Sequence, residues 1–270
     1  MRGRLWIRRS VIVFLSVIFA WTLLADVMAP AGYEEQFREA PSAAPSERFP
    51  LGTDELGRDR FSRLLYGGRI SLLLAPAAAL LATFISLGLG IMAGYFGGLP
   101  ERFALRFTDL VASTPSLLLL LFIRALLPLN IAPAVSVTIT FLLLGSIGWT
   151  SGVRVIAAAI SSARESDFIR QAVAAGSRRW RVVCLHISAA VLPVLKAQFW
   201  TMIPMFLVAE ANLGMLGLGV SEPLPSLGNM LSEIPLTGTL GSQPWVLAPA
   251  VLLFTVLLGL QSLLAKEISS

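Results

Sequence analysis

Charged residues are scarce in this chain, and several residue types on which catalytic centres depend are nearly missing. Only 14% of its 270 residues are charged, and it contains one cysteine, one histidine and two lysines. The single cysteine, Cys184, excludes an internal disulfide framework and a cysteine-cluster metal site. The single histidine, His186, leaves no histidine-rich metal centre. No G-x-x-x-x-G-K-[ST] motif occurs around Lys196 or Lys266, so the sequence contains no P-loop for ATP.

Apolar residues are correspondingly abundant. They amount to 56% of the chain, and the mean hydropathy is +0.77, a value that soluble globular domains do not reach. The formal net charge of +5 could suggest nucleic acid as a partner. Its basic residues flank apolar runs, however, which indicates membrane topology and not nucleic-acid binding. The composition therefore predicts an all-α, polytopic integral membrane protein.

Six runs are long enough to cross a bilayer, for which a helix needs about 20 mainly apolar residues. They lie at about 9–28, 71–95, 104–126, 131–152, 192–214 and 244–264. A cleaved signal peptide is the alternative for the first run. The charge-free stretch from Ser10 to Ala25 is long for a signal core, and Asp26–Met28 makes a poor cleavage site. We therefore expect residues 1–28 to form an uncleaved first helix.

The distribution of Lys and Arg predicts the orientation of these helices. With the N-terminus in the cytoplasm, fourteen of the 21 basic residues fall on the inside and seven on the outside. Five of those seven lie in one long outer loop at residues 29–68, which also carries seven acids, and a sixth, Arg69, directly follows this loop. We expect six spans with both termini cytoplasmic.

A polar island, "ESDFIRQAVAAGSRRWR" at 165–181, interrupts the apolar sequence in the cytoplasmic loop between the fourth and fifth spans. Ser166 or Asp167 can cap a helix that runs through Ala175. Gly176 supplies a left-handed stop, and Ser177 can cap a second, basic helix. Such a helix, glycine and helix can dock another protein, or it can lie as a basic hairpin on anionic lipid.

The island resembles the EAA loop of the membrane subunits of bacterial ABC importers. The matching residues are Asp167, Phe168, Ala172, Gly176, Arg181, His186, Ile187, Leu192 and Pro193. Arg170 and Gln171 depart from the pattern, because an acid and an alanine stand there in the family. The segments 51–75, "LGTDELGRDRFSRLLYGGRISLLLA", and 207–231, "LVAEANLGMLGLGVSEPLPSLGNML", narrow the resemblance to the dipeptide/oligopeptide/nickel permease group, in its compact second-permease type.

This resemblance implies a type I importer transmembrane fold over residues 69–265, with a coupling loop at about 155–190. The chain would be the pore subunit of an importer for di- or oligopeptides, or for a related small solute such as nickel, in a bacterial inner membrane. It would act with a second permease, two ATPase subunits and an extracytoplasmic solute-binding protein. It would bind no cofactor itself and would not be an enzyme, because ATP would be used by the partner ATPases.

The resemblance and the chemistry of the residues together nominate candidate sites. Six residues would dock the ATPase: Asp167, Phe168, Ala172, Gly176, Trp180 and Arg181. Phe168 and Trp180 would be the anchors, since buried aromatics dominate small interfaces. The translocation pathway has three candidates: Asp109, Glu210 and Asn212. Glu210 would either contact the cargo or support a re-entrant "GMLGLG" turn, by pairing with Asn212 or a backbone amide.

Asp109 lies one turn from Arg106, which predicts a structural i, i+3 pair. We expect Pro115 and Pro204 to kink their helices. Three glycines, Gly88, Gly90 and Gly94, should form small-residue faces for close helix packing.

The segment "TDELGRDRFSR" within residues 51–69 alternates acids and arginines, which suits self-paired charges. It would be either a salt-bridged interfacial helix leading into the second span or a platform for the binding protein or partner permease. A self-sufficient, ion-coupled secondary transporter is the alternative function. It requires several ionisable residues at mid-membrane, and only Asp109 and Glu210 are available.

Overall fold

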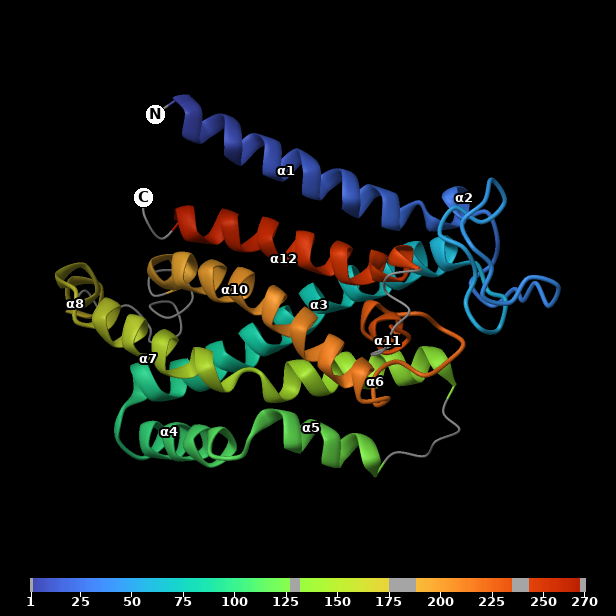
Figure 1. Cartoon of the computed structure of the whole chain (residues 1–270). Coiled ribbons are helices and arrows are strands. Elements are labelled where there is room, and N and C mark those ends of the chain that lie inside the picture. The colour runs from blue at the N-terminus through green and yellow to red at the C-terminus, as the bar shows by residue number, and fades with distance from the viewer. Residues whose placement is uncertain (1, 127–131, 175–187, 235–242, 268–270) are drawn as a thin grey trace. The chain divides into compact units, whose positions relative to one another are not determined.

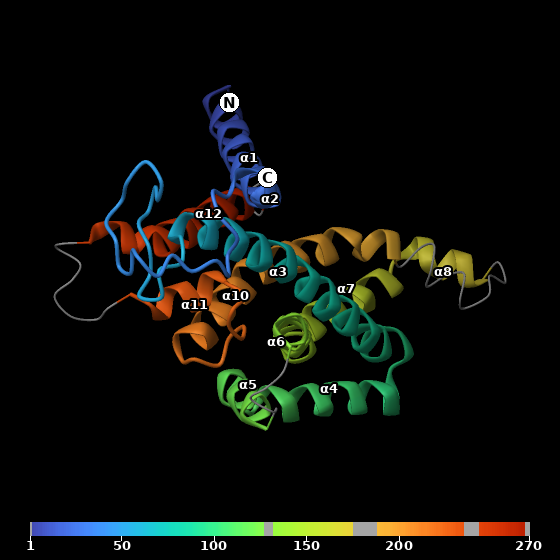
Figure 2. The same ribbon diagram turned by 90° about the vertical axis from the view of Figure 1, so that its right-hand side faces the viewer.

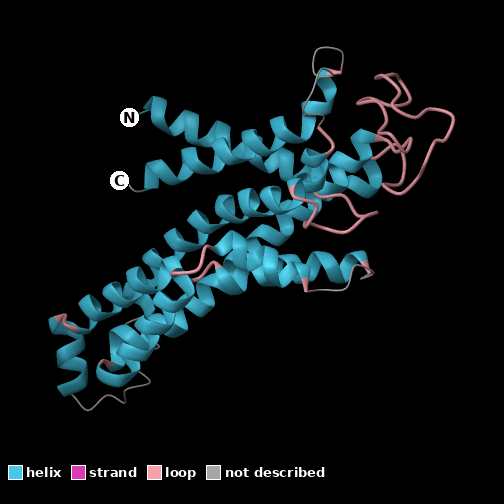
Figure 3. Ribbon diagram, turned by 60° about the horizontal axis from the view of Figure 1, so that its bottom comes forward, coloured by secondary structure: helices cyan, strands magenta, loops and turns pink. Residues whose placement is uncertain are grey.

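The computed structural model describes residues 2–126, 132–174, 188–234 and 243–267, and within these ranges it is built of helices and contains no strand (Figure 3). Two isolated β-bridges, Gln36–Arg58 and Thr53–Asp59, occur in the long loop after the first helix. The all-α class expected from the composition is confirmed. The chain divides into two compact units, each assembled from segments distant in sequence.

The first unit comprises 1–75, 123–141 and 204–270. Its complete helices are α1 (Arg2–Leu23), α2 (Ala25–Met28), α11 (Leu227–Ser232), η4 (Pro244–Leu247) and α12 (Ala248–Glu267). It also contains parts of four helices: the start of α3 (Arg60–Ile91), the end of α5 (Ser116–Ala125), most of α6 (Pro133–Ile147) and the end of α10 (Ser188–Met215). Figure 1 shows α1 and α12 side by side. Gly259 allows this approach, because a Cβ there would lie 2.8 Å from Leu15 Cδ2.

The second unit comprises 76–122 and 142–203. It contains the rest of α3, η1 (Met92–Phe96), α4 (Gly98–Ala112), most of α5 (Ser116–Ala125), α7 (Thr150–Arg164), α8 (Asp167–Ala174) and the start of α10. Figure 2 shows the chain reversing its direction between α3 and α4. The reversal occurs at Gly97 and Gly98, whose φ angles of 67° and 65° are in the region that favours glycine.

Two of the three glycines expected to permit close packing do so. A Cβ at Gly90 would lie 2.6 Å from Ile156 Cγ2, and one at Gly94 would lie 2.4 Å from the Ala157 carbonyl oxygen. Both contacts join the end of α3 and η1 to α7. The prediction for Gly88 is wrong, because no atom lies within 4 Å of a Cβ placed there.

Three helical segments are long and apolar enough to cross a membrane: Arg60–Phe96, Val191–Met215 and Pro244–Ala265. They contain the predicted second, fifth and sixth spans. The predicted third span, 104–126, is not one helix, because α4 and α5 meet at a 77° bend. The break precedes Ser116 and includes Pro115, as predicted.

The predicted fourth span, 131–152, is also bent. There α6 and α7 meet at 45° near Trp149. Its backbone oxygen accepts a hydrogen bond from Ser86 Oγ at 2.8 Å, which holds the break in place. The apolar part of α1, Arg9–Leu23, is shorter than a full span.

Candidate functional site

The first part of the candidate coupling segment is a short helix, α8, which begins at Asp167 as the sequence predicted. Ser166 precedes it, but its hydroxyl donates to the Ala163 carbonyl oxygen at 2.6 Å, back toward α7. Asp167, Phe168 and Ala172 lie in α8. Gly176, Trp180 and Arg181, together with the predicted second helix, lie outside the described residues.

One face of α8 is anchored in an apolar cluster. Ile169 is 3% exposed and packs with Ile156, Ile160 and Val191, from α7 and the start of α10. Asp167, Gln171 and Ala174 are exposed. Their spacing of i, i+4 and i+7 places them on one helical face, opposite Ile169. The exposed face of α8, which carries Asp167 and Gln171, therefore lies opposite the apolar cluster. The sequence identified Gln171 only as a departure from the EAA pattern, and nothing in it identified Ala174 as part of an exposed face.

The neighbouring helix α7 is tied to the rest of its unit by two arginines. Arg164 Nη1 donates to the Tyr95 carbonyl oxygen at 2.8 Å. Arg154 forms an ion pair with Asp109 of α4, so Asp109 has a partner on another helix in place of the expected Arg106. Both side chains of this pair are more than half exposed. Exposed pairs contribute about 0–1 kcal/mol, so this contact orients α4 more than it stabilises the unit.

Glu210 lies near the end of α10 and is fully buried. Its Oε2 accepts a hydrogen bond from Ser71 Oγ of α3 at 3.1 Å. The same hydroxyl oxygen accepts from the Leu227 backbone N–H at 3.1 Å. Ser71 thus joins the buried carboxyl group to the beginning of α11.

Glycines bring the end of α10 against α11. A Cβ at Gly228 would lie 2.6 Å from Glu210 Oε1, and one at Gly214 would lie 2.2 Å from the Gly228 carbonyl carbon. Ser226 caps α11 by accepting from the Asn229 N–H at 3.1 Å. This geometry supports the interpretation of Glu210 as a residue that holds the segment after α10. Asn212 is exposed, and it does not share the buried position of Glu210.

Six charged residues form an ion-pair network in the first unit: Asp54, Arg58, Arg60, Arg63, Glu222 and Glu233. Arg63 Nη2 lies 3.1 Å from Glu222 Oε1 and 3.0 Å from Glu233 Oε1. Arg60 Nη1 lies 3.3 Å from Glu233 Oε2. The two glutamates flank α11, so the network attaches both ends of the 222–233 segment to the start of α3. Three arginines face three carboxylates, and their formal charges cancel.

Local pairing accounts for only part of this network. Arg58 Nε lies 2.6 Å from Asp54 Oδ2, and Arg58 also pairs with Glu222. The prediction that the charges of 51–69 pair among themselves is therefore wrong for Arg60, whose carboxylate partner is Glu233. It holds in part for Arg63, which lies 3.8 Å from Asp54 Oδ2 but closer to Glu222 and Glu233, on either side of α11. The expected interfacial helix is also wrong over 51–59, which forms turns before α3 begins at Arg60.

The network places charged side chains in buried positions, where an unpaired charge is costly. The Arg63 side chain is 0% exposed and that of Arg58 is 8% exposed, whereas Glu222 is 52% exposed. Burial would lower the pKa of Arg58, but hydrogen bonds and charges from Asp54 and Glu222 raise it. Burial also raises the pKa of Glu233, against the opposing effect of Arg63 and Arg60. Buried ion pairs gain little net stability when intact, but losing one partner leaves a costly unpaired charge.

Comparison with known proteins assigns the chain to a family. The model for "Binding-protein-dependent transport system inner membrane component" matches residues 86–269. The dipeptide transport system permease protein DppC of Alkalihalophilus pseudofirmus is 32% identical over 252 residues, which cover 92% of this chain and 80% of that protein.

Two proteins of Haemophilus influenzae show similar agreement. The dipeptide transport system permease protein DppC is 29% identical over 92% of this chain and 84% of its own length. The oligopeptide transport system permease protein OppC is 30% identical over 87% of this chain and 74% of its own length. These matches confirm the resemblance seen in the sequence, and they do not support an ion-coupled secondary transporter. The chain belongs to the family of binding-protein-dependent transport system inner membrane components and is a permease subunit of an ABC importer.

Proposed function

We propose that this chain pairs with a second, homologous permease to form a pathway for di- or oligopeptides, or for a related small solute such as nickel. The names of the similar permeases support a peptide cargo. The assembly would lie in a bacterial inner membrane with both termini of this chain in the cytoplasm. A solute-binding protein would deliver the cargo from outside. The pathway candidates on this chain are Asp109, Glu210 and Asn212.

Two separate ATPase subunits would supply the energy through the coupling loop at about 155–190. Its docking residues would be Asp167, Phe168, Ala172, Gly176, Trp180 and Arg181. The observation that carries this proposal is the two-faced geometry of α8, with Ile169 buried against α7 and α10 and Asp167 exposed on the opposite side. Because one face of α8 is packed against its unit, a force applied to the other face would be transmitted to the helices that α8 contacts. Closure of the ATPases would therefore move α7 and α10 together with α8.

Co-purification of the permease with its ATPase subunits tests the docking site. Replacing Asp167 and Phe168 together with alanine should abolish co-purification, because it removes an exposed charge and an aromatic anchor. The matched control replaces Glu55 and Leu56, an exposed acid and an exposed apolar neighbour in the outer loop. The control should retain the ATPase at the wild-type level. Equal retention by both double variants would refute docking at α8.

A second variant tests the turn in the coupling loop. Gly176→Asp should leave membrane insertion intact, while cargo uptake into vesicles falls to background. The physical reason is that a side chain at the predicted left-handed position obstructs the turn between the two short helices. Uptake at the wild-type rate would contradict the proposed position of the turn.

A further inference from the structure

The helix α4 has one face fixed inside its unit. Ala104 is fully buried in a cluster with Ala93 and Ala157, and Thr108 is 1% exposed. Asp109 on the same helix is paired with Arg154 of α7. These contacts define which side of α4 faces inward, and the opposite side is largely exposed.

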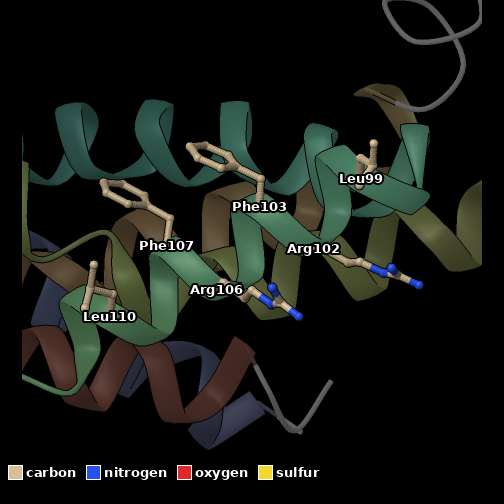
Figure 4. Close-up of a pocket in the computed structure, with 6 residues that line it drawn as sticks. All are labelled: Leu99, Arg102, Phe103, Arg106, Phe107 and Leu110. Carbon is tan, nitrogen blue, oxygen red and sulfur yellow. The ribbon is translucent and has the colours of Figure 1, made fainter.

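The outward side of α4 carries a shallow pocket of about 450 Å³. It is lined by Leu99, Arg102, Phe103, Arg106, Phe107 and Leu110 (Figure 4). Four of these side chains are apolar, and no acidic side chain lines the pocket. Leu99, Phe103 and Leu110 are 79%, 62% and 68% exposed. Figure 4 shows both arginines extending to one side of the helix and both phenylalanine rings to the other.

The two arginines differ from Arg154 and Arg164 of the same unit, each of which has a polar partner. Arg154 has Asp109, and Arg164 donates to a carbonyl oxygen. Within the part of the chain that the structure describes, Arg102 and Arg106 have neither an ion pair nor a hydrogen bond to an acceptor. They lie four residues apart, so their guanidinium groups are on the same helical face. Two unneutralised cations therefore border a row of exposed hydrocarbon.

The phenylalanine rings form a flat apolar wall beside these cations. Phe103 and Phe107 are parallel, with ring centroids 6.1 Å apart. Phe107 is stacked on Trp149, with centroids 5.6 Å apart and planes 15° apart. The stack holds the wall in a defined orientation next to the break between α6 and α7.

We propose that this pocket binds an anionic phospholipid. Its phosphate would lie between Arg102 and Arg106, since guanidinium groups bind phosphate oxygens in a bidentate geometry. Its acyl chains would follow Phe103, Phe107 and Leu110. Basic clusters beside apolar helix surfaces favour anionic lipids for this reason. The proposal depends on the chain being a membrane protein and not on its cargo or its protein partners.

A second permease subunit fits this surface less well. A protein interface would desolvate both arginines, which is costly unless the partner brings carboxylates to them. A lipid headgroup supplies the negative charge itself and leaves the guanidinium groups partly hydrated. Charge complementarity therefore favours the lipid.

Lipid retention by the complete importer tests the proposal. The complex is exchanged into membranes of equal parts phosphatidylglycerol and phosphatidylcholine, purified with limited detergent, and its retained lipid is quantified by mass spectrometry. We expect enrichment of phosphatidylglycerol that falls about fivefold for each arginine removed, in Arg102→Gln, Arg106→Gln and the double variant. The control, Arg38→Gln with Arg48→Gln, makes the same charge change in the outer loop and should keep the enrichment. Equal enrichment in both double variants would overturn the proposal.

Photo-crosslinking identifies the occupant directly in an otherwise unchanged chain. A photoreactive residue in place of Leu99 should give an adduct with the mass of a phospholipid. An adduct with the second permease, or no adduct at all, would overturn the proposal. This readout decides the matter even if the arginine variants fail to fold.

Discussion

Arg63 has no exposed side-chain surface and nevertheless carries a full positive charge among Glu222, Glu233 and Asp54. We predict that Arg63→Ala lowers the free energy of unfolding of the purified protein by about 3–5 kcal/mol, because it leaves three carboxylates with only two arginines, Arg58 and Arg60, in a largely buried network. The measurement is the thermal or denaturant midpoint in detergent.

The loop between α2 and α3 offers a matched control. Arg48 pairs with Glu39 at 3.7 Å, and both side chains are more than 60% exposed. Arg48→Ala should cost no more than about 1 kcal/mol, since exposed pairs contribute little. If the two arginine variants unfold at the same midpoint, the buried network does not hold α11 to α3 as the geometry indicates.

Two variants of Glu210 distinguish a structural role for this residue from contact with the cargo. Glu210→Gln keeps the shape and an acceptor for Ser71, whereas Glu210→Ala removes both and opens a cavity. We expect the glutamine variant to melt close to the wild type and to transport, and the alanine variant to lose about 2–4 kcal/mol. A glutamine variant that folds normally but fails to transport would instead support contact between Glu210 and the cargo.

At the scale of helices, the contact of α3 and η1 with α7 depends on missing side chains. Gly94→Val should force the two apart, because its Cβ would meet the Ala157 carbonyl oxygen at 2.4 Å. Overpacking of this kind costs about 1–3 kcal/mol or more. Gly88→Val is the control, since no atom lies within 4 Å of its added Cβ. Limited proteolysis of both variants compares the two sites, and equal protection would show that the η1–α7 contact tolerates a side chain.

The hydrophobic runs predicted where the helices lie in the sequence, but not where the backbone bends between them. The continuous segments Arg60–Phe96, Val191–Met215 and Pro244–Ala265 were predicted from hydropathy with shorter ends. Hydropathy reports residence in lipid and not the path of the backbone, so the 77° bend between α4 and α5 had only Pro115 as a local signal. The break near Trp149 had none, because it depends on a hydrogen bond from Ser86, 63 positions away.

The same limit applies to the candidate sites. The start of α8 at Asp167 followed from a local pattern, because capping is a property of neighbouring residues. The partners of Arg60 and Arg63 could not be predicted, since Glu233 is 173 and 170 positions away from them. An alternation of charges shows that they will be paired but not with which residues.

For the whole molecule, orientation is the property that most needs measurement. Replacing Cys184 with serine leaves a chain without cysteine, and single cysteines can then report on each side. We predict that Ala44→Cys reacts with an impermeant maleimide in right-side-out vesicles, and that Ser270→Cys reacts only in inside-out vesicles. The expectation follows from the excess of arginine on the predicted inner side. The reverse labelling pattern would invert the proposed topology.

The ion-pair network around Arg63 also has a consequence during biosynthesis. Arg58 leaves the ribosome 164 residues before Glu222, a delay of roughly 8 to 33 s at the usual rate of about 5–20 residues per second. Throughout this interval the three arginines have only Asp54 of their final partners. The arginines therefore lack Glu222 and Glu233 as partners until α10 has been inserted. A chain truncated before Glu222 would lack both partners permanently, which gives quality-control proteases a basis for distinguishing unfinished subunits from complete ones.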